Sequence, residues 1–179
     1  HYDMVPMNPM TAVAFVLAGA SLAMLRRPHQ DSLARRLGRM LALGVLLIGA
    51  IKLGEELFGW KVAIDQVLFR DRLAATPFPL PNRMAPNTAL GFAMVGAALL
   101  IATLPTRGAS RASQYLALCA GLQALMAALG YSYDVRSFYG IASYVPMALN
   151  TAVAFAVLSL GIFFLHPAIG LANVFVRDD

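Results

Sequence analysis

The stretch Met84-Ala-Pro-Asn-Thr-Ala-Leu-Gly-Phe92 decides the fold, because related forms of it occur three times. The other copies are Met7-Asn-Pro-Met-Thr-Ala-Val-Ala-Phe15 and Met147-Ala-Leu-Asn-Thr-Ala-Val-Ala-Phe155. Each copy opens a long apolar run, and Pro or Asn just before such a run is a helix-start signal. The repeat therefore predicts three buried helices that begin in the same way.

Each predicted helix start carries a methionine, a turn-forming or capping residue, and a threonine. The start positions are Met7, Thr11, Met84, Asn87, Thr88, Met147, Asn150 and Thr151. Asn side chains can accept N–H bonds from a first turn, and Pro suits the start of a helix. Two interpretations stay open. The repeat serves packing alone, or the three starts converge and line a shared pocket.

Composition indicates a membrane protein. Hydrophobic residues make up 59% of the 179 residues and charged residues only 13%, whereas soluble domains are about half apolar and a quarter charged. The apolar residues fall in blocks near the ~20 residues that a helix needs to cross a bilayer. The net charge of +5 does not indicate nucleic-acid binding, because the arginines lie in short connections between these blocks.

We expect an all-α, polytopic membrane helical bundle with five visible spans, built from three hairpin-like repeats with the first helix missing. That missing helix would lie before residue 1 of a longer parent chain. Residues 1–167 form the bundle, and residues 168–179 form an interfacial helix or linker at the cytoplasmic side. The spans are expected at about 9–25, 37–58, 87–104, 112–129 and 149–165.

Arginine placement predicts the orientation. Five arginines fall in what we interpret as one connection between the first two spans: Arg26, Arg27, Arg35, Arg36 and Arg39. Two more, Arg107 and Arg111, fall in the predicted turn 105–111. Cytoplasmic connections carry an excess of Lys and Arg. Residue 1 is therefore expected outside and residue 179 in the cytoplasm.

The end of the second span carries Lys52, Glu55 and Glu56. Lys52 and Glu56 are four residues apart and can pair on one helix face. Charges within a spanning helix are functional candidates, but the same residues could be wetted at the outer interface. Trp60 follows, and 60–69 has the spacing of a short amphipathic helix on the outer surface.

The second outer connection, between the fourth and fifth spans, is rich in tyrosine. It contains Tyr131, Tyr133, Asp134, Arg136 and Tyr139. An aromatic belt at the membrane interface accounts for tyrosines in this place. An aromatic lid over a cavity is the other interpretation.

Catalytic chemistry is not indicated. The chain has no phosphate-binding glycine loop, no Gly-x-Ser-x-Gly and no His-Glu-x-x-His, so we expect no enzyme, no cofactor and no metal site. The single cysteine, Cys119, lies in an apolar run and is interpreted as a buried structural thiol. Gln123 is expected to hydrogen-bond to a neighbouring helix.

The phrases 84–92 and 139–155 resemble the amino-terminal membrane sensor regions of bacterial signalling proteins. In those proteins three similar hairpins precede PAS domains and a histidine kinase or diguanylate cyclase output domain. The resemblance implies a location in the bacterial inner membrane and a signal-transduction role. It implies a cytoplasmic output domain or a partner membrane protein. This chain has no kinase histidine box and no Gly-Gly-Asp-Glu-Phe signature.

Two functions follow from these observations. One is a membrane-embedded signal-input domain. Its expected ligand-binding residues are Lys52, Glu55, Glu56, Trp60, Tyr131, Tyr133, Asp134, Arg136 and Tyr139. The alternative is an accessory structural subunit of a larger respiratory or photosynthetic membrane complex. In both cases the partners are the lipid bilayer and another protein. We expect an oligomer and no nucleic acid.

Overall fold

A computed structural model describes residues 7–26, 32–60, 62–64, 68, 83–133 and 147–176, and throughout these ranges the regular structure is helical. The long helices are α1 (Pro9–Leu25), α2 (Ser32–Phe58), α4 (Pro86–Ala102), α5 (Arg107–Ser132) and α7 (Leu149–Phe163). A 3-10 turn, η2 (Gly170–Ala172), and a short helix, α8 (Asn173–Val176), follow. The expected all-α class is confirmed for this part of the chain.

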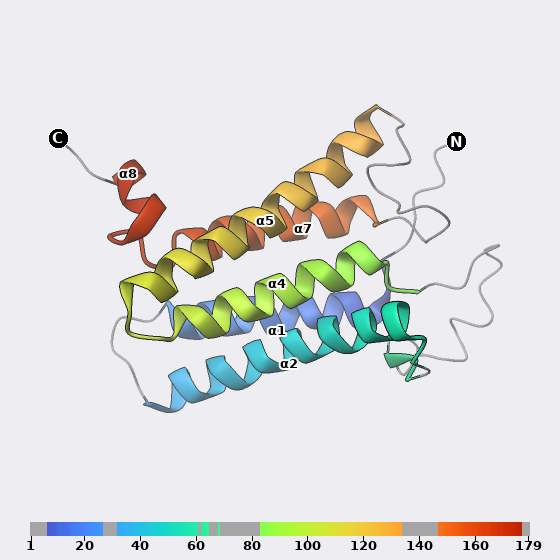
Figure 1. Cartoon of the computed structure of the whole chain (residues 1–179), viewed down its shortest axis with the longest axis horizontal. Coiled ribbons are helices and arrows are strands. Elements are labelled where there is room, and N and C mark those ends of the chain that lie inside the picture. Colours follow the sequence, from blue (N-terminus) through green and yellow to red (C-terminus); the bar gives the residue numbers. More distant parts are fainter. Residues whose placement is uncertain are drawn as a thin grey trace.

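The five long helices form a bundle in which α1, α4 and α7 run in one direction and α2 and α5 in the other (Figure 1). The helix α4 packs against both α2 and α5, and α1, α4 and α7 also contact one another. The helices α1, α4 and α7, called the inner helices below, therefore all begin at one end of the bundle (Figure 1). That end also holds the end of α2.

The inner helices begin as the repeated phrase predicts. Asn8 caps α1 by accepting a hydrogen bond from the Met10 N–H at 2.8 Å, and Pro9 and Pro86 each occupy the first helical position. The Asn87 and Asn150 side chains accept hydrogen bonds from the N–H groups of Thr88 and Thr151. These bonds satisfy N–H groups that have no partner inside the helix.

Three phenylalanines, one from each copy of the phrase, meet where the inner helices come together. Phe15 lies 4.8 Å from Phe92 and 4.7 Å from Phe155 between ring centroids, and Phe92 lies 4.8 Å from Phe155. Phe92 and Phe155 are fully buried. Tilted and edge-to-face contacts at such distances are favourable. At this level the centre of the bundle is filled by aromatic rings, which agrees with the packing interpretation of the repeat.

Small residues let the helices approach closely. A Cβ added at Gly96 of α4 would lie 2.5 Å from the Leu46 backbone nitrogen, and one at Gly49 of α2 would lie 2.5 Å from the Ala93 nitrogen. Gly91 leaves room for the ring of Phe155. Alanine dominates the remaining buried positions. Close backbone approach through small residues is typical of helix pairs in membranes.

Two helices begin earlier than the apolar pattern suggests. Arg35, Arg36 and Arg39 lie in the first turns of α2 and not in a loop, and Arg107 and Arg111 lie in α5. The expected turn at 105–111 is therefore too long, because the chain is helical from Arg107 onward. Thr106 caps α5 by accepting a hydrogen bond from the Ala109 N–H. The apolar run marks only the later part of each helix. The first helical turns carry arginines, so hydropathy does not identify them as helix.

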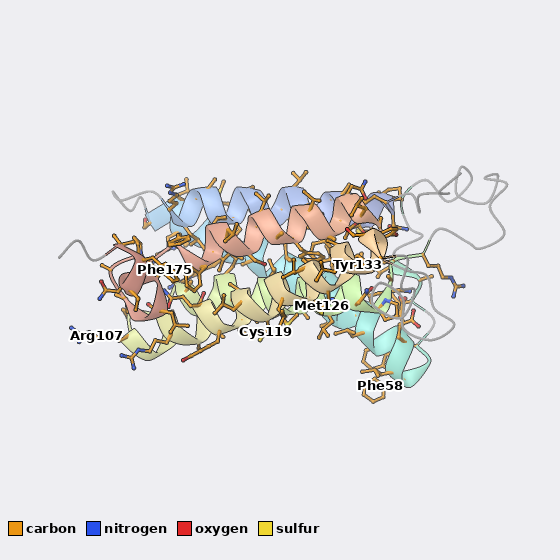
Figure 2. The ribbon with its side chains drawn as sticks, turned by 90° about the horizontal axis from the view of Figure 1, so that it is seen from above. Phe58, Arg107, Cys119, Met126, Tyr133 and Phe175 are labelled. Atoms are coloured by element: carbon orange, nitrogen blue, oxygen red, sulfur yellow. The ribbon has the colours of Figure 1, made fainter. Side chains whose placement is uncertain are left out.

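Two further expectations are wrong. Trp60, Val62 and Ala63 are not helical, so the amphipathic helix does not begin at Trp60. Gly59 has a φ of 68°, a left-handed conformation that terminates helices and that glycine adopts without strain. Cys119 is exposed on α5 and not buried, and Figure 2 shows it on the outer side of that helix.

Two of the described helices, α2 and α5, are long and apolar enough to span a membrane. The other three apolar helices are shorter: α1 and α4 have 17 residues each and α7 has 15.

Candidate functional site

The last turns of α2 hold a buried cluster of three charged side chains, called the charged cluster below. Lys52 Nζ donates to Glu55 Oε2 at 3.0 Å and lies 3.1 Å from Glu56 Oε1. The exposed fractions of these side chains are 3% for Lys52, 7% for Glu55 and 20% for Glu56. The predicted pairing of Lys52 with Glu56 is confirmed, and Glu55 joins it. Glu55 and Lys52 are withdrawn from the surface, so the wetted-interface interpretation does not describe them.

The segment after α2 closes over this cluster. The second oxygen of Glu55, Oε1, accepts a hydrogen bond from the Ile64 N–H at 3.0 Å. Trp60 packs its ring over Gly54, where an added Cβ would lie 2.5 Å from the ring, and stacks on Phe58 at 5.5 Å. Glu55 thus joins a cation on α2 to the backbone of the segment that follows α2.

The charged cluster carries one positive and two negative charges when all three groups are ionised. Burying ions costs several kcal/mol each unless close partners compensate. Lys52 sits on the same face as the buried Gly49 and Val45, so its stem enters the bundle and its ammonium group lies between the two carboxylates. A change in the charge of either carboxylate therefore changes the charge balance of the whole cluster.

The tyrosines at the end of α5 lie in a second group. Tyr131 donates from its hydroxyl to the Met147 carbonyl oxygen at 2.8 Å, which joins the end of α5 to the start of α7. Tyr133 is 74% exposed. Asp134, Arg136 and Tyr139 lie outside the described residues, so their predicted place in the site is not described.

The two groups of candidate residues do not meet in the described structure. The helix α4 lies between α2 and α5 (Figure 1). Figure 2 likewise shows Phe58, at the end of α2, apart from Tyr133 at the end of α5. The described part of the candidate site is therefore the charged cluster with Trp60 and Ile64, and the tyrosines form a separate contact.

The helix-start residues lie at the same end of the bundle as these two groups (Figure 1). Thr11, Thr88 and Thr151 are buried, as are Met84 and Met147, while Met7 is half-buried. Each threonine lies one helical turn before the phenylalanine of its copy. Gln123 donates its amide to the Asn87 carbonyl oxygen, which confirms the expected bond between α5 and a neighbouring helix.

No protein-family model, curated protein or solved structure matches this chain.

The opposite end of the bundle contains polar contacts that the sequence analysis missed. The Arg39 Nε donates to Thr103 Oγ1 at 3.0 Å, and both Arg35 and Arg39 donate to the Thr103 carbonyl oxygen. This carbonyl follows the last residue of α4, where cations are favourable. The arginines were interpreted only as orientation signals. Their helical spacing, 35 and 39, is the signal that could have placed them on one face.

Gln114 holds the end of the described chain against α5. Its amide donates to the carbonyl oxygen of Ile169 at 2.8 Å and its oxygen accepts from the Leu171 N–H at 2.8 Å. The buried Ala172 packs into the same end. The segment 168–176 is therefore docked on the bundle.

Proposed function

We propose that this chain is an integral membrane protein whose five long helices all cross the bilayer. The supporting observation is the distribution of apolar side chains. Large hydrophobic residues cover the outside of the helices, including Val16, Leu43, Leu47 and Leu122, while alanine and glycine fill the inside. Exposed apolar surface on this scale requires a covering of lipid or protein. Three hairpin-like repeats, the first represented by α1 alone, account for the arrangement.

The charges at the two ends support an orientation. The described arginines of one end are Arg26, Arg35, Arg36, Arg39, Arg107 and Arg111, and the two described carboxylates, Glu55 and Glu56, lie at the other. An excess of arginine marks the cytoplasmic side. The charged cluster then faces the outside of a bacterial inner membrane.

The function that this geometry supports best is a signal-input domain. The charged cluster is the observation that supports it, because ionisable groups buried in a spanning helix are expensive and are retained for function. Glu55 binds both Lys52 and the backbone of Ile64, so a stimulus that competes for this carboxylate releases the segment after α2. A stimulus acts by binding two states of the protein differently.

The helix α2 offers a physical route for the signal across the membrane. It carries the charged cluster at one end, and Arg35 and Arg39 at the other end bind Thr103 after α4. One continuous helix thus connects the outer cluster with the cytoplasmic end of the α2–α4 pair. A cytoplasmic output domain or partner protein would read a shift of this helix.

An accessory structural subunit of a respiratory or photosynthetic complex is the second candidate. One observation favours it: the outward face of α1 is apolar and exposed, with Val16 70% exposed. A larger complex could cover that face.

A charge variant tests the signal-input function. Glu56→Gln neutralises the more exposed carboxylate and leaves the Lys52–Glu55 pair in place, so the protein is expected to fold. Arg83→Gln, at an exposed position of the same end, is the matched control. In the native host, protein histidine phosphorylation and cellular cyclic di-GMP are measured at equal protein abundance. We expect Glu56→Gln to change one of these outputs and Arg83→Gln to change neither.

An unchanged output in both variants contradicts the signal-input function. Recovery of the chain in fixed stoichiometry with a respiratory or photosynthetic complex, together with that unchanged output, favours the structural subunit.

A further inference from the structure

The three inner helices are covered unequally. The helix α4 has a long antiparallel neighbour on each side, α2 and α5, whereas the one antiparallel neighbour of α1 in the described structure is α2 and that of α7 is α5. Ten of the residues of α4 are buried, but only Thr11, Ala14, Ala18 and Ser21 of α1. One flank of α1 and one of α7 are thus without an antiparallel neighbour in the described structure. Figure 2 shows α1 along one edge of the bundle, next to α7.

Aligning the three copies of the repeated phrase identifies the uncovered face of α1. Counting from Phe15, the exposed stripe consists of Ala12, Val16, Gly19 and Ala23. The corresponding stripe of α4 is buried or half-buried and consists of Ala89, Ala93, Gly96 and Leu100. The corresponding stripe of α7 is also buried or half-buried and consists of Ala152, Ala156, Ser159 and Phe163.

Gly19 shows the difference most clearly. Its counterpart Gly96 lies against the backbone of Leu46 in α2, and its counterpart Ser159 lies against Gly121 in α5. A Cβ added at Gly19 would meet no atom within 4 Å. The position at which two inner helices receive an antiparallel helix is therefore open on the third.

We propose that the Ala12–Val16–Gly19–Ala23 stripe of α1, together with the adjoining flank of α7, is covered by a sixth apolar helix of the same polypeptide. This helix runs antiparallel to α1 and is joined to its start, as α2 is joined to α4 and α5 to α7. It occupies the third of three equivalent positions around the phenylalanine cluster. This inference rests on the proposed membrane location and is independent of signalling.

The contacts of α2 and α5 define the chemistry of the covering helix. Gly49 of α2 faces Ala89 and Ala93, and Gly121 of α5 faces Ser159. Backbones that approach this closely leave room only for small side chains between them. The covering helix therefore carries Gly, Ala or Ser opposite Ala12 and Val16, the counterparts of Ala89 and Ala93, and leucine-sized residues toward lipid.

The experiment uses the full-length polypeptide in its native membrane. A photo-reactive amino acid replaces Val16, and in a control protein it replaces Leu122 of α5. Both side chains are exposed, at 70% and 58%, and both lie within one helical turn of the Gly19 or Ser159 level. After irradiation the crosslinked peptides are identified by mass spectrometry. We expect Val16 to crosslink to a segment that precedes α1 in the same polypeptide, with the monomer mass retained, and Leu122 to form lipid adducts.

Three results would overturn the proposal. These are lipid adducts alone at Val16, a crosslink to a second copy detected as a dimer, and a crosslink to a different protein. Failure of the signal-input function would leave the Val16 result unaffected, because crosslinking does not measure output.

A pair of glycine variants provides a second measurement. Gly19→Leu and Gly44→Leu both place a large side chain where this structure has open space. If a helix covers Gly19, only Gly19→Leu lowers the unfolding midpoint of the full-length protein. Equal midpoints for both variants contradict the covering helix.

Discussion

Phe15, Phe92 and Phe155 show what one residue type does when it recurs at one place in a repeat. Each ring extends from its own helix into the centre of the bundle, and the ring centroids lie 4.7–4.8 Å apart. Gly91, one residue before Phe92, leaves the space that the Phe155 ring occupies. The phrase therefore encodes a packing unit, and its threonines and asparagines serve the helix starts next to it.

Lys52, Glu55 and Glu56 follow a different rule at the same scale. The phenylalanines are held by apolar packing. The three charged groups are instead held by ion pairs, because Lys52 lies beside both carboxylates. Removing Lys52 leaves the two carboxylates without their cation, whereas removing Glu56 leaves the Lys52–Glu55 pair in place.

The charged cluster yields a prediction for stability. We expect Lys52→Met to lower the free energy of unfolding by about 3–5 kcal/mol, because two carboxylates lose their cation. Glu55→Gln combined with Lys52→Met should cost less than the sum of the single changes, with a coupling of about 1–3 kcal/mol. The measurement is a double-mutant cycle from unfolding in mixed detergent. Strict additivity would show that the pair contributes nothing to folding.

At the scale of helices, contact distance is set by glycine. The helices α2 and α4 approach through Gly49 and Gly96, each of which faces backbone atoms of the other helix. Backbone cannot move aside as the end of a flexible side chain can. The α2–α4 pair is therefore closely packed, and the proposed signal route through α2 requires such a contact.

Replacing these glycines tests the helix contact. Gly96→Ala should lower the free energy of unfolding by about 1–3 kcal/mol, because its methyl group would overlap the Leu46 backbone. Gly44→Ala, which meets no atom within 4 Å, should raise it by up to about 1 kcal/mol through better helix propensity. Unfolding midpoints of both variants measure the difference. Changes of the same sign would mean that the close contact does not exist.

The whole molecule is polarised along the bundle. All the described arginines except Arg83 gather at the end where α2 and α5 begin, and the described carboxylates lie where α2 ends (Figure 1). Some of these arginines have a second task, because Arg35 and Arg39 hold the end of α4 through Thr103. One set of residues thus supports both the proposed orientation and the contact between α2 and the end of α4.

Cysteine labelling tests the orientation. In a Cys119→Ser background, single cysteines are introduced as Arg83→Cys at one end and Gly108→Cys at the other, both at exposed positions. A membrane-impermeant maleimide should label the position 83 variant in intact spheroplasts and the position 108 variant only after permeabilisation. The reverse pattern would place the charged cluster in the cytoplasm and remove the basis for an external stimulus.

The sequence by itself determined the elements and their starts. The apolar runs predict five long helices, and the repeated phrase places the starts of α1, α4 and α7 within a few residues. The Lys52–Glu56 pair also follows from spacing alone. These features are local: hydropathy, capping and i,i+4 geometry act within one segment. The same local view failed at the first turns of α2 and α5, where charged residues continue a helix, and at Trp60.

Only the tertiary structure decided which faces are buried and which residues meet. In a helix that is apolar on all sides, hydropathy does not show which face is buried. The sequence therefore predicts a buried Cys119, whereas its side chain is exposed on the surface of the bundle. The contacts of Arg39 with Thr103 and among the three phenylalanines depend on distances between segments far apart in the chain. The bond from Ile64 to Glu55 depends on how the chain turns back after α2. The repeat phrase marks three equivalent helices, but the packing alone shows that α2 and α5 cover two of them and leave Gly19 open. A side chain is buried only when another helix packs against it, and which helices pack together is determined by the tertiary structure.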